Sequence, residues 1–93
     1  MKVQIKYELK SWSEFFNEII AGRKTHELRR SSDRNFQVGD CLKLKEFNRR
    51  ENKYTGREVL VEVTYITGDF SPCAYSNEAI KAGFCILSIK LIK

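Results

Sequence analysis

The stretch SWSEFFNEIIAGRKTHELRR, residues 11–30, determines how the first half of this chain folds. Its apolar side chains recur at the spacing of an amphipathic helix, and they are Trp12, Phe15, Phe16, Ile19 and Ile20. Ser11 followed by Glu14 matches a capping box, and Gly22 stands where a left-handed residue ends a helix. The sequence therefore predicts a helix over about residues 12–21.

A short strand is expected directly after this helix. In KTHELRR, residues 24–30, alternation places Leu28 on one face and both Glu27 and Arg29 on the other. Alternating and β-branched runs predict further strands at residues 2–9, 41–47, 57–67 and 84–92, with a loop or hairpin tip over 48–56 and a short helical turn near Asn77–Lys81. Five short strands and one early helix indicate an α+β domain. Because closure removes exposed strand edges, we expect a small barrel with the helix stripe laid over one opening.

The composition indicates one globular domain over residues 1–93. Of these 93 residues, 42% are hydrophobic and 31% are charged, which suits a single core. No apolar run approaches the roughly 18 residues of a membrane span, and the first residues lack the apolar core of a signal peptide. We therefore expect a cytoplasmic protein with no membrane partner. The formal net charge of +5 favours polyanions as partners.

The cysteines do not predict a metal site. Cys41, Cys73 and Cys85 are far apart and show no CxxC spacing, and His26 is the sole histidine. Buried thiols explain them, and we expect neither a metal nor another cofactor.

Charge is concentrated around the end of the predicted helix. Arg23 and Lys24 follow the helix C-terminus, where the dipole favours cations by roughly 0.3–1 kcal/mol each. That preference does not explain Glu27 and Arg29, which lie on the next strand. Those two either show a charged face to water or form a site.

The pattern formed by Gly22, Lys24, Glu27 and Arg29 resembles G-x-K-x-x-E-x-R, the signature of ASCH domains, which are relatives of the PUA domain. The turn FQVGD and the strand YTGREVLVEVTYI fit the same order, and the likeness covers nearly the whole chain. The chain looks most like a short, uncharacterised bacterial and phage branch of that superfamily. The resemblance implies a PUA-like β-barrel of about five to six mixed strands with the helix packed on it. It also implies a cleft that binds RNA or a nucleotide.

Within that cleft, the guanidinium of Arg29 would engage a phosphate or a base edge, and Lys24 would supply a point charge. Glu27 would either accept from an exocyclic amino group or brace its neighbours. Trp12 and Tyr7 could stack a base, although the helical position of Trp12 favours the core. The expected ligand-binding residues are Arg23, Lys24, Glu27, Arg29, Arg30 and Trp12.

Two alternatives to a binding domain stay open. Some similar ASCH proteins hydrolyse the acetyl amide of N4-acetylcytidine, with a lysine that Lys24 matches. Their threonine is replaced here by Glu27, and Glu78 is only a nominal match for their glutamate. If the protein were this amidohydrolase or a ribonuclease, Lys24 with Glu27 or His26 would be its catalytic acid and base. The other alternative is a protein-interaction module, and the oligomeric state is left open.

A second basic surface is also conceivable at the hairpin expected around Tyr54. Its cations are Arg49, Arg50, Lys53 and Arg57. The competing interpretation is a solvated hairpin tip.

Overall fold

The computed structural model describes residues 4–68, 73–75, 80 and 83–92. Its elements follow the predicted order, and their bounds are β1 (Ile5–Trp12), α1 (Ser13–Ile20), β2 (His26–Arg30), β3 (Cys41–Asn48), β4 (Lys53–Thr67) and β5 (Phe84–Leu91). The helical turn expected near Asn77–Lys81 lies mostly outside the described residues. Residues 2 and 3, at the start of the first predicted strand, also lie outside them.

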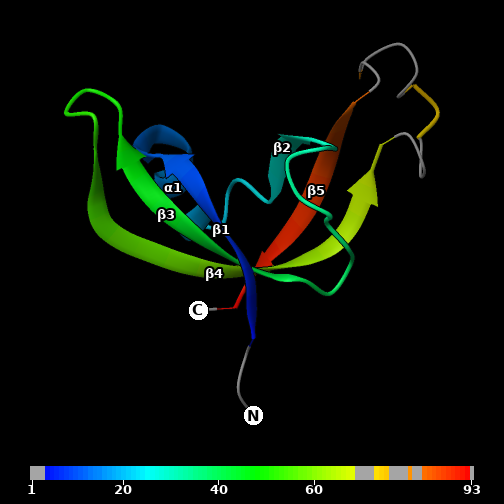
Figure 1. The fold of residues 1–93 in the computed structure, drawn as a ribbon, viewed down its shortest axis with the longest axis horizontal. Helices are drawn as coiled ribbons and strands as arrows, with labels where there is room; N and C mark the ends of the chain where they lie inside the picture. The colour runs from blue at the N-terminus through cyan, green and yellow to red at the C-terminus, as the bar shows by residue number, and fades with distance from the viewer. Residues whose placement is uncertain (1–3, 69–72, 76–79, 81–82, 93) are drawn as a thin grey trace.

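The five strands form one mixed sheet in the order β1-β3-β4-β5-β2. Strand β1 is parallel to β3, and the other neighbours are antiparallel. The sheet bends into a half-barrel, with β1 and α1 on one arm and β2 and β5 on the other (Figure 1). The α+β class is confirmed. The predicted closure of the sheet into a barrel is not confirmed, because β1 and β2 remain two separate edges in the described part of the chain.

The long strand β4 produces the bend. Its first part pairs with β3 and its second part with β5, and the register shifts between Val63 and Tyr65. A second shift opposite Lys45 and Phe47 coincides with Gly56, whose φ of +94° suits glycine. The hairpin tip predicted over 48–56 is present but shorter than predicted, because pairing continues to Asn48 and Lys53.

The helix begins later than predicted. Strand β1 continues through Ser11 to Trp12, which is the N-cap residue, and no side chain caps the helix. The capping-box prediction is therefore wrong, because Ser11 is held in the ladder opposite Glu46 of β3. The predicted stop is confirmed. Gly22 has a φ of +82°, and the amides of Gly22 and Arg23 donate to the carbonyls of Ile19 and Glu18.

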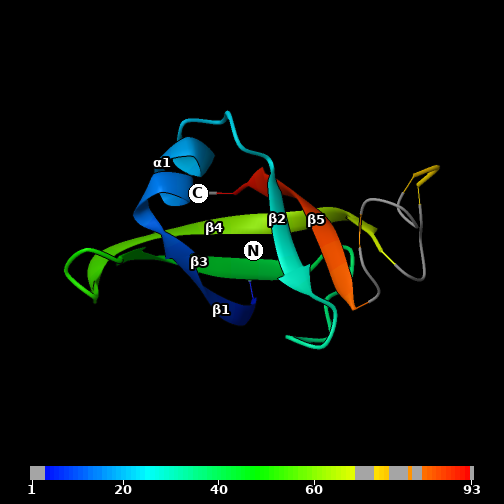
Figure 2. The same ribbon diagram turned by 90° about the horizontal axis from the view of Figure 1, so that it is seen from above.

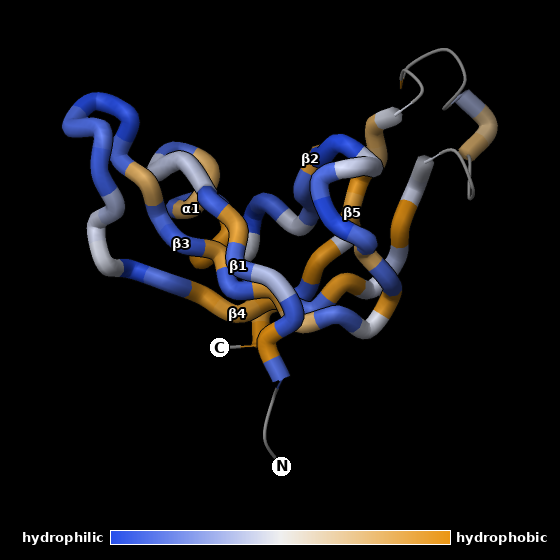
Figure 3. Tube along the Cα trace, viewed as in Figure 1, coloured by the Kyte–Doolittle hydropathy of each residue, from blue (hydrophilic) through white to orange (hydrophobic). Residues whose placement is uncertain are grey.

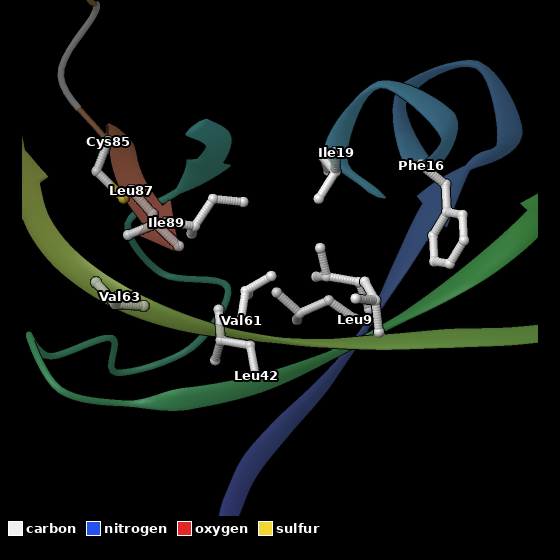
Figure 4. Close-up of a cluster of buried hydrophobic side chains, with 11 residues drawn as sticks. Leu9, Phe16, Ile19, Leu42, Val61, Val63, Cys85, Leu87 and Ile89 are labelled. Atoms are coloured by element: carbon white, nitrogen blue, oxygen red, sulfur yellow. The ribbon is translucent and has the colours of Figure 1, made fainter. Parts of the chain in front are cut away.

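The core lies on the concave face of the sheet. Phe16 and Ile19 of α1 are buried there against β1, β3, β4 and β5 (Figure 4). The rest of the predicted helix stripe is not buried: Trp12, Phe15 and Ile20 are 39%, 45% and 40% exposed. A helix of eight residues contacts the sheet through one narrow face, so only two residues of the stripe reach the core.

Hydrophobic residues follow the middle of β4 and of β5, whereas the β3–β4 hairpin tip is hydrophilic (Figure 3). In the part of the chain that the structure describes, no helix is long and apolar enough to cross a membrane.

Candidate ligand-binding site

A pocket of about 510 Å³ lies between the two edges of the half-barrel. Figure 2 shows α1 and β1 on one side of this region and β2 and β5 on the other. Three kinds of residue line the pocket besides Leu28: the cationic Lys10, Arg29 and Arg30, the aromatic Trp12, Phe15 and Phe84, and the polar or acidic Ser11, Glu27 and Asp33.

The guanidinium of Arg29 joins the two edges across this pocket. Arg29 donates to the Oε2 atom of Glu27 from Nε at 3.1 Å and from Nη2 at 2.9 Å. The same guanidinium donates to the Lys10 carbonyl of β1 at 2.7 Å and to Asp33 Oδ2 at 3.3 Å. Arg29 therefore ties β2 to β1 by side-chain bonds where the sheet has no ladder.

The inward face of β2 is the charged one. Glu27 is 7% exposed and pairs across the ladder with the buried Leu87, whereas Leu28 is 59% exposed. Glu27 and Arg29 do share one face, as the alternation predicted, but the idea that this face is turned to water is wrong. An inward-pointing charge on an edge strand also discourages pairing with another chain.

Two polar atoms in the pocket have no hydrogen-bond partner among the described residues. Ser11 is 4% exposed, yet within the described residues its Oγ is buried and makes no hydrogen bond. Both bonds from Arg29 end on Oε2 of Glu27, so among the same residues the Oε1 atom accepts none. A buried hydroxyl without a partner costs free energy, and it marks a place where a ligand or water would bond.

Aromatic rings stand at the rim. Trp12 and Phe15 are stacked, with centroids 5.7 Å apart and planes at 24°. The guanidinium of Arg30 lies 5.2 Å from the ring centroid of Phe84. Trp12, which its predicted helical position assigned to the core, thus lies at the edge of the pocket. Tyr7 does not line the pocket but packs edge-on against Phe36.

The structure brings together four of the six predicted site residues: Trp12, Glu27, Arg29 and Arg30 line the pocket. Arg23 does not, because it pairs with Glu18 at 2.6 Å on the surface. Lys24 does not line it either. Its ammonium donates to the carbonyl of His26 at 3.0 Å and lies 3.3 Å from the exposed His26 ring.

Sequence reasoning missed Ser11, Phe15 and Phe84 as pocket residues. Ser11 has the parity of Leu9 in an alternating strand, and extending that strand past residue 9 would have placed it inward. Phe84 comes next to Arg30 only through the pairing of β2 with β5. The residues near Phe84 in the sequence give no indication of that contact.

One of the cations predicted around Tyr54 is bound to polar groups of other segments. Arg57, whose side chain is 52% exposed, donates to the buried Glu46 at 2.7 Å and to Asn17 at 2.6 Å. This guanidinium, with a smaller contribution from the Thr55 hydroxyl, lowers the pKa of Glu46 to about 2, although burial opposes the shift. The cation over the Tyr54 ring is Lys45, at 4.9 Å, which was not predicted.

Cys41 and Cys85 are buried in β3 and β5, as expected, but Cys73 is exposed. In the ranges that the structure describes, no group of three or more His, Cys, Asp or Glu side chains is placed to hold a metal ion.

The fold and the pocket define a small α+β half-barrel domain whose polar, aromatic-rimmed pocket lies between the edge strands β1 and β2, which do not pair with each other in the described residues. The family model "Domain of unknown function (DUF3850)" matches residues 6–89, and the chain belongs to this family. A comparison with curated proteins finds no match.

Proposed function

We propose that this domain binds RNA or a nucleotide in the pocket between β1 and β2. The observation that carries the proposal is the unpartnered hydroxyl of Ser11, 4% exposed, inside a pocket that also presents stacked rings and cations. A nucleotide needs these three kinds of contact: a hydrogen-bonding edge, a stacking surface and a positive charge. The resemblance of the G-x-K-x-x-E-x-R pattern to ASCH domains supports the same class of ligand.

Each pocket residue then has a defined part. Trp12 is stacked on Phe15 and has the Arg49 guanidinium 4.0 Å from its ring centroid, so a base would take the place of Arg49 on the ring. Ser11 Oγ and Glu27 Oε1 offer hydrogen bonds to the edge of that base. Arg30 and Lys10 are the cations available to a phosphate, since in the described residues no carboxylate pairs with either of them. Arg29 is already bonded to Glu27, Asp33 and Lys10, so its role is to hold the site in shape.

The pocket favours binding over hydrolysis of a modified nucleoside. The hydrolase interpretation depends on Lys24, which lies outside the pocket lining, and on Glu78, which lies outside the described residues. It predicts loss of the acetyl group from N4-acetylcytidine, abolished by Lys24→Ala. A protein-interaction module predicts neither turnover nor binding of nucleic acid.

Binding is tested by the fluorescence anisotropy of a labelled pool of short single-stranded RNA at about 0.15 M salt. We expect Trp12→Ala to weaken binding about tenfold, because loss of a stacking ring costs roughly 1–3 kcal/mol per base. Trp12→Phe should keep most of the affinity, and Arg23→Met, which removes a cation outside the pocket, should change it little. An equal loss for Trp12→Ala and Arg23→Met would mean that only surface charge binds RNA, and the proposal would fail.

Replacing Ser11 by alanine should affect stability and binding in opposite directions. It removes a buried hydroxyl without a partner, so we expect the free energy of unfolding to rise by about 1 kcal/mol. RNA affinity should fall by roughly tenfold, since a ligand edge then loses its hydrogen bond. Urea unfolding and anisotropy measure the two effects on one protein preparation. A stable variant with unchanged affinity would exclude Ser11 from the binding site.

A further inference from the structure

Four aromatic side chains from four different segments lie next to one another on the structure. Phe15 stacks on Trp12, Trp12 is the ladder partner of Phe47, and Phe47 meets Tyr54 edge-on with centroids 5.1 Å apart. Paired residues of neighbouring strands present their side chains on the same face. These four residues, Phe15, Trp12, Phe47 and Tyr54, are called the aromatic track below.

The track starts in the pocket and leaves it. Phe15 and Trp12 line the pocket, whereas Phe47 and Tyr54 lie on the β3–β4 hairpin and do not. Tyr54 is 48% exposed at the far end. Two of the four rings of the track therefore lie outside the pocket.

Each ring of the track has one cation close to it. The distances to the ring centroids are 5.7 Å for Lys24 and Phe15, 4.0 Å for Arg49 and Trp12, 4.2 Å for Lys10 and Phe47, and 4.9 Å for Lys45 and Tyr54. Two carboxylates offset part of this charge, because Glu14 pairs with Arg49 and Glu8 with Lys45 at 3.5 Å. Lys10 and Lys24 have no carboxylate partner in the described residues, so the track stays positive.

Trp12, Phe15 and Tyr54 are exposed and Phe47 is half-buried. Accessible rings interleaved with cations are the features by which proteins hold single strands of nucleic acid. Each ring offers a face to a base, and each cation lies within reach of the neighbouring phosphate. A duplex hides its base faces in its own stack and cannot use such rings. If the cations served only to stabilise the rings, the rings would not need to adjoin a pocket.

We propose that the aromatic track extends the pocket into a binding surface for single-stranded nucleic acid, with successive bases on Trp12, Phe47 and Tyr54. This inference rests on the proposed function, because the first nucleotide occupies the pocket. It assigns the hairpin to the ligand site and makes a strand of several nucleotides, rather than a mononucleotide, the preferred ligand.

The test compares labelled RNA of two lengths, a dinucleotide and an oligomer of about eight nucleotides, on the full chain. We expect the longer strand to bind wild type at least tenfold more tightly than the dinucleotide. Tyr54→Ala should remove most of this gain and leave dinucleotide affinity within about twofold. Tyr54→Phe keeps the ring and should bind as wild type.

Tyr65→Ala is the matched control, because Tyr65 is a 54% exposed tyrosine on the same strand but outside the track. The proposed role of the track would be wrong if wild type bound RNA of both lengths with equal affinity. It would also be wrong if Tyr54→Ala and Tyr65→Ala had equal effects. Neither result would contradict the proposal for the pocket. A duplex that binds as tightly as the single strand would also overturn the proposed role of the track. If wild type binds neither length, the proposed function fails and this inference fails with it.

Discussion

Replacing Arg29 by methionine should lower the free energy of unfolding by about 3 kcal/mol. The change leaves the Glu27 carboxylate, 7% exposed beside Leu87, without its counter-ion. It also takes a 2.7 Å hydrogen bond from the Lys10 carbonyl and so releases β1 from β2. Breaking a buried pair by removing one partner costs about 3–5 kcal/mol, and the open pocket places this pair at the lower end. Urea unfolding measures the change.

The double variant Glu27→Leu with Arg29→Met should recover more than half of that loss, because no unpaired charge remains in the apolar surroundings. Arg23→Met is the surface control. Its partner Glu18 is exposed, so the free energy of unfolding should not change measurably. If Arg29→Met were as stable as wild type, the bracing role would be wrong, and Arg29 would again be a candidate for direct contact with the ligand.

Replacing Glu46 by glutamine should lower the free energy of unfolding by about 2 kcal/mol at neutral pH. Arg57 holds the pKa of this carboxyl at about 2, compared with an ordinary value of 4.5. That difference corresponds to at most about 3 kcal/mol. The side chain of Arg57 is 52% exposed, so solvent screening reduces the effect to the smaller figure.

The stability difference between wild type and Glu46→Gln should also depend on pH. The pKa of Glu46 is lower in the folded state than in the unfolded state, so the carboxylate stabilises the fold above the unfolded pKa. That stabilisation is lost as the pH falls through the folded pKa. The difference should therefore shrink between about pH 5 and pH 2, which unfolding curves at several pH values would show.

Glu58→Gln is the control for this experiment. Glu58 pairs with Lys43 at 3.4 Å on the surface, and its loss should cost well under about 1 kcal/mol. A constant difference between wild type and Glu46→Gln over the whole pH range would contradict the charged interaction between Glu46 and Arg57. The glutamine variant would then be less stable for reasons of packing.

The sequence predicted the elements well because each carries its own local signal. Alternating residues located the five strands, the apolar spacing located the helix, and Gly22 located its end. The boundary between β1 and α1 was misplaced. Ser11 and Glu14 satisfy a capping box as a pattern, but the ladder with β3 holds Ser11 in the strand. A tertiary contact outweighed a local preference there.

The pocket could be predicted only in part. The motif placed Glu27 and Arg29 on one face, and that pairing is local to β2. The same motif also suggested Lys24, and the basic stretch around it suggested Arg23, but the turn after α1 directs both side chains elsewhere. Alternation extended past residue 9 could have placed Ser11 inward, whereas the residues around Phe84 do not specify its contact with Arg30 of β2.

The sequence by itself determined the period of each element, the helix stop at Gly22 and the shared face of Glu27 and Arg29, because these follow from neighbouring residues and backbone geometry. Only the tertiary structure decided that this charged face turns inward while Leu28 turns outward. A period of two fixes which side chains share a face but not which face is buried. The bend of the sheet made that choice, since it brings β1 and β2 opposite each other and lets Arg29 bond across the opening.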